Sequence, residues 1–445
     1  MGRKIAVGVK FIMNIHISQI KNFLLLLLLF VLPWQTRLIY QTAYLGNDFW
    51  EYGSLSLYGT EILLGVIILL FLVDKIRTGF HDLFITHFDK KRLAIIVAGF
   101  LVILSLYYFS SANHAVTWQY LNWLIYGACL FFIILESRLS FKKLSLCIWA
   151  GGLFQAVLGI WQFFSQYISA NKWLGMAVQD PRQLGVAVVE FGDERWLRAY
   201  GAFGWPNSLG IYLAVVFVLG VILICHSRES GNLTEKTDPR FHGDDILLIG
   251  QIIILSGLFL SFARGAWLAV AVGLCILGFK KYKEKTFWQQ VGICGVTFLM
   301  LLIIFKPLVF SRLDFQNRLE KISISQRVNQ WSEFQQVWSK NYLVGTGPGN
   351  YTAVLRNLYP KYFVGDLKPV HNIFLLFIAE WGLIGVILLS VFLFYSKKIL
   401  DWSFAPSIVL LVAGLFDHWS LSTFTGLMFF CVIIGLSVKQ LYDCK

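Results

Sequence analysis

The stretch Pro206–Cys225, PNSLGIYLAVVFVLGVILIC, contains no charged residue. A helix needs about 20 mostly apolar residues to cross the hydrocarbon core of a bilayer, so this stretch predicts a membrane-spanning helix. Comparable apolar runs recur between Phe23 and Leu436. The chain of 445 residues is 57% hydrophobic and only 14% charged, with a mean hydropathy of +0.66. This composition excludes a soluble enzyme, a disordered chain and a secreted disulfide scaffold, and it predicts an all-α polytopic membrane protein.

Windows of the required length predict about 12 transmembrane helices. They fall at approximately 16–33, 57–74, 93–110, 118–136, 143–166, 205–225, 246–262, 265–280, 287–305, 372–396, 404–420 and 422–438. No small-residue cleavage site follows the first window, so we expect a retained span and not a signal peptide. The boundary between the last two windows stays open, because Asp417, His418 and a Ser/Thr run fall where they meet.

The positions of the cations predict the orientation. Most Lys and Arg fall in connections on the same side as the N-terminus, which the positive-inside rule assigns to the cytoplasm, together with the C-terminus. Residues 1–305 then hold helices 1–9, with an outward loop at 167–204. Residues 306–371 form a large, partly helical extracytoplasmic loop, and residues 372–445 hold helices 10–12 and a cytoplasmic tail. Because the cations follow this membrane pattern, we expect no nucleic acid partner.

The loop at 306–371 carries a net positive charge, which suits an anionic ligand, although a solvated loop near anionic lipid is equally compatible. Within the loop, the segment Ser325–Lys340 predicts a helix with Ser325 as its N-cap. Arg327 shares one helical stripe with aromatic residues, namely Trp331, Phe334 and Trp338. Such a stripe fits a helix against the membrane interface, and an arginine stem that packs there while its head reaches water is the alternative.

A glycine-rich stretch, LVGTGPGN at 343–350, follows this helix. It lacks the Lys-Ser/Thr pair of a phosphate-binding P-loop. We expect it to form a tight turn.

Ionisable residues are scarce within the predicted spans and comprise Glu61, Glu380 and Asp417. A proton- or ion-coupled transporter normally needs a chain of such groups near the midplane, so their scarcity argues against transport.

Arginines instead lie at the expected outer boundary. Arg264 occupies a very short turn between two spans, and Arg195 and Arg198 directly precede the helix that begins near Pro206. Planar guanidinium groups bind phosphate oxygens in a bidentate manner. Several arginines at one depth therefore predict a phosphate pocket, whereas a lone arginine at such a turn is more simply a topological anchor.

His371 and Asn372 open the tenth span directly after the basic loop. At 100° per residue, Gly382 and Gly385 fall about 20° and about 40° from the direction of His371, so both would allow close packing beneath it. Glu380 points the opposite way. The alternative for His371 is an interfacial residue bonded to backbone. His114 and His418 receive no role.

The sequence predicts neither a metal site nor a cofactor. The outward acids form no Asp-x-Asp pair and no cluster, and the seven cysteines form no CxxC pair. A reaction at this surface would therefore use arginines in place of a metal to neutralise a leaving diphosphate.

These motifs together resemble the O-antigen ligase and O-antigen polymerase family of bacterial envelope glycosyltransferases. The family's H-[N/S/Q]-x9-G-x-x-G signature is similar to the segment that begins at His371-Asn372 and ends, after nine further residues, with Gly382-Leu-Ile-Gly385. The next residue, Val386, departs from the residues usual in the family. The other similar segments are Ser261–Trp267 (S-x-x-R-G), Arg327–Trp331 (R-x3-W), Gly345–Tyr351 (glycine-rich), and Arg198–Phe203 with Pro206-Asn207. They cover about 198–386 and occur in family order.

The resemblance implies a glycan donor on a polyprenyl diphosphate such as undecaprenyl diphosphate, at the outer face of the bacterial cytoplasmic (inner) membrane. The family's ligases transfer the glycan to a sugar hydroxyl of lipid A–core, with inversion and without metal or nucleotide. His371 would be the base, and Arg198, Arg264 and Arg327 would hold the diphosphate. Asn372, Gly382 and Gly385 would support the site.

Several alternatives stay open at this point. Polymerases and protein O-oligosaccharyltransferases of the same family share the donor and differ in the acceptor, so the acceptor, the glycan structure and the oligomeric state are not determined. A glycan or lipid exporter is the alternative from another functional class.

Overall fold

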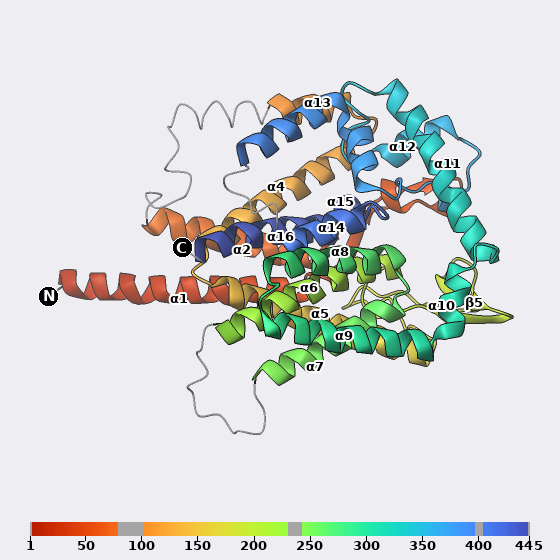
Figure 1. The fold of residues 1–445 in the computed structure, drawn as a ribbon. Coiled ribbons are helices and arrows are strands. Elements are labelled where there is room, and N and C mark those ends of the chain that lie inside the picture. The colour runs from red at the N-terminus through yellow and green to blue at the C-terminus, as the bar shows by residue number, and fades with distance from the viewer. Residues whose placement is uncertain (1, 79–101, 230–242, 397–403, 444–445) are drawn as a thin grey trace.

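Helix α6 (Pro206–Glu229) forms the centre of a helical bundle in the computed structural model, which describes residues 2–78, 102–229, 243–396 and 404–443 (Figure 1). The apolar window Pro206–Cys225 is entirely buried within the protein. Four helices pack around α6: α5 (Phe141–Ser165), α7 (Gly243–Leu260), α8 (Arg264–Lys280) and α14 (Ala405–Gly414). The stretch that most clearly predicts a membrane span is therefore covered by protein on all sides.

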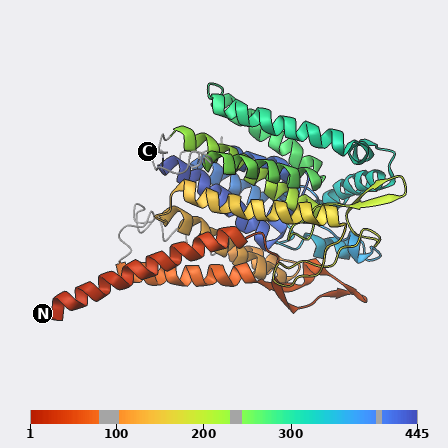
Figure 2. The same cartoon turned by 90° about the horizontal axis from the view of Figure 1, so that it is seen from below.

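The remaining elements complete the bundle and one of its ends. The other long helices are α1 (Gly2–Val31), α2 (Gly59–Thr78), α4 (His114–Glu136), α9 (Lys285–Ile304), α11 (Arg318–Lys340), α13 (Ile373–Ser396) and α16 (Phe424–Asp443). The shorter elements are α10 (Lys306–Leu313), α12 (Tyr351–Leu358), α15 (Trp419–Ser422) and the 3-10 turns η1 (Glu51–Gly53) and η3 (Val364–Asp366). Residues 102–110 are also helical. Helices α1 and α2 pack side by side at the edge of the bundle (Figure 2).

The described residues also form three small two-stranded antiparallel sheets, which are called the hairpins below. Strand β1 (Arg37–Gln41) pairs with β4 (Leu55–Tyr58), β2 (Tyr44–Leu45) with β3 (Asp48–Phe49), and β5 (Val188–Phe191) with β6 (Glu194–Leu197). They lie at the same end of the bundle as α10, α11 and α12, and at the opposite end from the start of α1 and the end of α16 (Figure 1).

The helices confirm a multi-pass membrane protein. Among the described residues, six helices are long and apolar enough to cross a bilayer: α4, α5, the Pro206–Cys225 part of α6, α9, α13 and α16. Shorter apolar helices occur at Ile17–Val31, Asp245–Leu260 and Ala405–Gly414. The total of about 12 spans stays a prediction, and residues 93–101 of the expected span at 93–110 lie outside the described residues.

Two expected helices differ from the observed ones. The single helix expected at 404–420 is interrupted, because α14 ends at Gly414 and the Asp417 carboxylate accepts a hydrogen bond from the Trp419 amide (2.9 Å), which starts the short α15. The helix expected from Ser325 begins earlier, at Arg318. Its N-cap is Asn317, whose side chain accepts from the Leu319 amide, so Ser325 lies inside α11 and caps nothing.

Helix α13 is kinked at Gly382, where φ is 58° and ψ is −165°. The turn at 342–347 docks onto the kink. Thr346 and Gly347 donate backbone hydrogen bonds to the carbonyls of Ala379 and Glu380 (3.0 and 3.1 Å). In the other direction, the Leu383 and Ile384 amides donate to the carbonyls of Tyr342 and Leu343 (2.8 and 3.1 Å). A break in an apolar helix requires such partners for the backbone groups it frees.

This kink corrects the expected alignment of His371 with the glycines. His371 precedes the first helical residue, Ile373, and the regular 100° step is lost at Gly382. The glycine-rich turn itself is confirmed as a turn. Gly382 therefore serves the docking of this turn and not a helix packed beneath the histidine: a Cβ on Gly382 would lie 2.5 Å from the Gly345 nitrogen and the Leu343 oxygen.

Candidate active site

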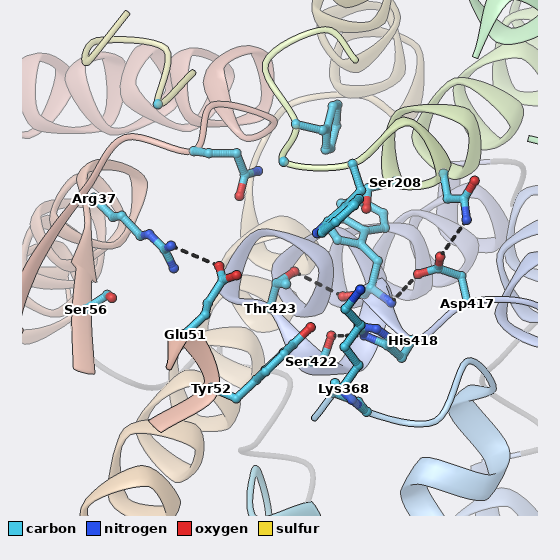
Figure 3. A pocket seen from close by; sticks show the side chains of 18 of the residues that line it. Arg37, Glu51, Tyr52, Ser56, Ser208, Lys368, Asp417, His418, Ser422 and Thr423 are labelled. Atoms are coloured by element: carbon cyan, nitrogen blue, oxygen red, sulfur yellow. Dashed lines mark hydrogen bonds and ion pairs between the residues drawn. The ribbon is translucent and has the colours of Figure 1, made fainter. Parts of the chain in front are cut away.

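A cavity of about 430 Å³, lined by both polar and apolar side chains, opens at the end of the bundle that carries the hairpins and α11 (Figure 3). It is lined by segments far apart in the chain. Arg37, Glu51 and Tyr52 come from the N-terminal hairpin region, Arg198 and Asn207 from the entry to α6, and Lys368, His371, Asp417 and His418 from the C-terminal part. In Figure 3, Arg37 and Glu51 lie across the cavity from Asp417 and His418. Arg37 and Glu51 form an ion pair of 2.9 Å.

His371 lies half-buried at the start of α13. Its ring Nδ1 lies 2.9 Å from Oε1 of Gln330 on α11, and its backbone N–H donates to the same oxygen at 3.1 Å. The ring of His418 packs edge-on against it, with centroids 5.1 Å apart. Desolvation, followed by the neighbouring His418, lowers the pKa of His371 below its ordinary value of 6.5. The imidazole is therefore neutral at pH 7.

The break between α14 and α15 supplies Asp417 and His418. His418 Nδ1 lies 2.6 Å from the Ser422 hydroxyl, and burial lowers the pKa of His418. The Asp417 carboxylate accepts from the Asn207 amide (3.4 Å), and Asn207 in turn accepts from Arg198 (2.7 Å). A hydrogen-bonded chain therefore joins the entry of α6 to the residues beside His371.

Arg198 begins a cluster of cations next to the cavity. It is buried and donates from Nε to the Ser261 carbonyl at 2.7 Å, within the turn between α7 and α8. Burial, and then repulsion by Arg312, lower the pKa of Arg198 to about 9. Burial also lowers the pKa of Arg312 to about 10, although the nearby Glu320 favours its charged form.

Glu320 holds two members of this cluster. Its carboxylate, in a residue only 1% exposed, forms ion pairs with Arg264 on α8 and Arg312 on α10. Arg264 also donates to the Arg312 carbonyl. The cluster contains four arginines, Arg198, Arg264, Arg312 and Arg327, and two nearby acids, Glu320 and Asp417. Because the positive charges outnumber the negative ones, the end of the bundle beside the cavity is electropositive.

The structure brings the predicted site residues together in part. His371 and Arg198 both line the cavity, whereas Arg264 and Arg327 are not among its lining residues. The charge of Arg327 still acts on His371, and that of Arg264 on Arg198. On the α11 stripe, Trp331 and Trp338 are exposed and Phe334 is buried. Arg195 pairs with Glu190 at 3.5 Å.

Asn372 and Gly385, which were expected to support the site, make the following contacts. The Asn372 side chain accepts from the Phe374 and Leu375 amides (2.9 and 3.1 Å), so it caps α13, and it donates to the Leu415 carbonyl (3.2 Å). Asn372 thereby connects the residue next to it, His371, to the segment between α14 and α15 that contains Asp417. At Gly385, a Cβ would lie 2.3 Å from the Trp381 Cβ and 3.1 Å from the Tyr107 hydroxyl.

The sequence reasoning missed Gln330, Arg312 and Glu320 and assigned His418 no role. Gln330 lies inside the Arg327–Trp331 segment, one turn of helix after Arg327, which is the signal that could have marked it. Within the described residues, no three His, Cys, Asp or Glu side chains come together as metal ligands. Metal independence stays a prediction.

The apolar helices and the cavity beside the arginine cluster define a multi-pass membrane protein with a cavity at one end of its bundle. Residues 249–390, about a third of the chain, match the family model described as O-antigen ligase, and this match supports the predicted resemblance to that family. The match includes Arg264, Arg327 and His371 and ends before Asp417. No curated protein matches the chain.

Proposed function

We propose that the protein transfers a glycan from a polyprenyl diphosphate to an acceptor hydroxyl at the outer face of the cytoplasmic membrane. The observation that carries this proposal is the position of His371 in the lining of the cavity, beside an arginine cluster. A neutral imidazole can take the proton of a sugar hydroxyl, and arginines can stabilise a leaving diphosphate.

The bond changes follow from these positions. The acceptor oxygen gives its proton to His371 and attacks the anomeric carbon, while the bond from that carbon to the diphosphate oxygen breaks. The diphosphate leaves with the electron pair, and the excess of arginine charge stabilises it. A single displacement of this kind inverts the anomeric configuration.

The test uses purified protein in detergent with a polyprenyl-diphosphate-linked glycan and an acceptor, so that no membrane gradient exists. We expect release of polyprenyl diphosphate together with a new glycosidic bond. A glycan or lipid exporter would form no such bond in detergent, but after reconstitution into vesicles it would move the donor across the membrane, and this result would refute the proposal.

The identity of the acceptor distinguishes a ligase from a polymerase or a protein O-oligosaccharyltransferase of the same family. Offering lipid A–core, a second donor-linked glycan and a serine-containing peptide separately distinguishes a ligase, a polymerase and a protein O-oligosaccharyltransferase. We propose the ligase-like reaction, with lipid A–core or another surface glycan as acceptor.

The proposed reaction needs no metal, since arginines neutralise the leaving group. Full activity in EDTA is therefore expected. A loss of transfer on chelation that magnesium or manganese restores would contradict the arginine account.

A further inference from the structure

Gln330 makes two hydrogen bonds to one residue through one atom. Its Oε1 lies 3.1 Å from the backbone nitrogen of His371 and 2.9 Å from the ring Nδ1 of the same histidine. Gln330 is 7% exposed and sits on α11, 41 residues before its partner. These contacts join the large loop to the first residue of the α13 entry.

The two contacts together determine the state of the imidazole. A backbone N–H can only donate, so the amide atom that faces it must be the oxygen of Gln330. An amide oxygen can only accept, so Nδ1, which faces the same oxygen, must carry a hydrogen. In a neutral imidazole the other nitrogen, Nε2, then carries the lone pair.

We infer that Gln330 is a positioning residue that holds His371 in the Nδ1–H tautomer, so that Nε2 is the atom that takes the acceptor's proton. This inference rests on the proposed glycosyl transfer. Without the glutamine oxygen, both neutral tautomers become available, and only one of them presents a basic Nε2.

A neutral amide suits this position because the surroundings of His371 are already charged. His418 and Asp417 face it from the break before α15, Arg327 from α11, and Lys368 from the segment that leads into α13. A carboxylate in place of Gln330 would accept the same two hydrogen bonds but would favour the imidazolium. The amide therefore fixes the tautomer without adding a negative charge that would favour the imidazolium.

The experiment compares Gln330→Leu and Gln330→Glu with the wild type, and uses Gln335→Leu and Gln335→Glu as controls. Gln335 is an exposed glutamine on the same helix. Histidine-specific ¹⁵N labelling reports the tautomer of each ring, and the His371 signals are assigned by their absence in His371→Gln. Monodisperse elution and an unchanged melting temperature identify the variants that are folded.

We expect the Nδ1–H tautomer in the wild type and in both Gln335 variants. Gln330→Leu should lose this preference and transfer about 10–100-fold more slowly at saturating substrates, the usual effect of removing a partner that orients a functional histidine. Gln330→Glu should keep hydrogen-bonded Nδ1–H but move the acid limb of the rate–pH profile to higher pH, because a carboxylate raises the histidine pKa.

The tautomer and the activity report on different claims. If folded Gln330→Leu keeps the Nδ1–H tautomer, or if Gln330→Glu leaves the acid limb in place, the inference is wrong even where transfer occurs. If the tautomer changes as expected but no variant and no wild-type protein forms a glycosidic bond, the positioning role stands and the proposed function fails.

Discussion

At the scale of single residues, the protonation state of His371 decides what the site can do. Burial beside His418, Arg327 and Lys368 lowers its pKa from 6.5, so the free base persists into mildly acidic solution. A general base acts only while it is unprotonated. The transfer rate should therefore stay flat between pH 8 and pH 6.5 and should fall only below the lowered pKa, as protons fill the ring.

The variant His371→Ala should insert normally and bind donor but lose transfer by about 10²–10⁴-fold, the usual contribution of a positioned base. Steady-state rates across pH provide the check, and the Ala variant should lack the acid limb. A folded His371→Gln with substantial activity and an unchanged pH profile would instead assign the histidine to orienting the acceptor, and general-base catalysis would be excluded.

Arginine geometry leads to a second prediction. Arg264 uses both terminal nitrogens, one toward the Arg312 carbonyl and one toward Glu320, and Arg327 adds a further charge near His371. A lysine ammonium is a point charge and cannot reproduce the planar fork. Arg264→Lys and Arg327→Lys should therefore both lose donor affinity and transfer.

The measurement is the donor KM together with kcat for the Lys and Ala variants at both positions. Arg182→Lys, an exposed residue of the 167–204 loop, serves as a control. If both Lys variants work normally while the Ala variants fail, positive charge or topology accounts for the two arginines better than bidentate binding does.

The sequence predicts residues that belong to local motifs and misses those whose role depends on a distant partner. His371 and Arg198 stand beside recognisable helix entries and do meet at the cavity. Gln330 meets His371 across 41 residues, and Glu320 meets Arg264 across 56, so no local pattern announces either contact. Asp417 falls in an apolar window and looks like a span residue until the helix break is seen.

At the scale of the element, the kink in α13 positions the loop that carries α11. Gly382 occupies φ 58° and ψ −165°, a region essentially restricted to glycine. Gly382→Ala should destabilise the protein by at least about 1–3 kcal/mol, because the backbone is strained and the new Cβ meets the 343–345 turn. Thermal unfolding in detergent, with transfer measured in parallel, tests this.

The matched control is Gly292→Ala, a glycine in the middle of α9 whose added Cβ meets nothing within 4 Å. Alanine is the better helix former there, so the melting temperature should stay or rise. Equal melting temperatures for both variants would show that the kink does not need glycine.

The ends of helices can be predicted from the sequence where the apolar run is continuous. The windows at 143–166 and 287–305 end within a few residues of α5 and α9. Two predictions are wrong because the helix is broken. These are the angle from His371 to Gly382 and the single span at 404–420. Breaks of this kind depend on partners from other segments, such as the turn at 342–347, and leave no clear mark in hydropathy.

At the scale of the whole molecule, the arrangement separates two ends of the bundle. The cavity, the hairpins and α10 to α12 share one end, and the turn between α8 and α9 belongs to the other, with the start of α1 and the end of α16 (Figure 1). From the distribution of cations we propose that the second end faces the cytoplasm. Membrane class could be predicted from composition, whereas the meeting of distant segments around one cavity could not, since no local pattern shows which of these segments contact one another.

This orientation predicts which surfaces reagents reach in intact cells. Leu184 in the 167–204 loop and Phe363 in the 306–371 loop are exposed, as is Tyr282 between α8 and α9. With the native cysteines replaced by serine, Leu184→Cys and Phe363→Cys should react with a membrane-impermeant maleimide in spheroplasts. Tyr282→Cys should react only after permeabilisation. The opposite pattern would place the cavity on the cytoplasmic side, where no donor presented at the outer face could enter it.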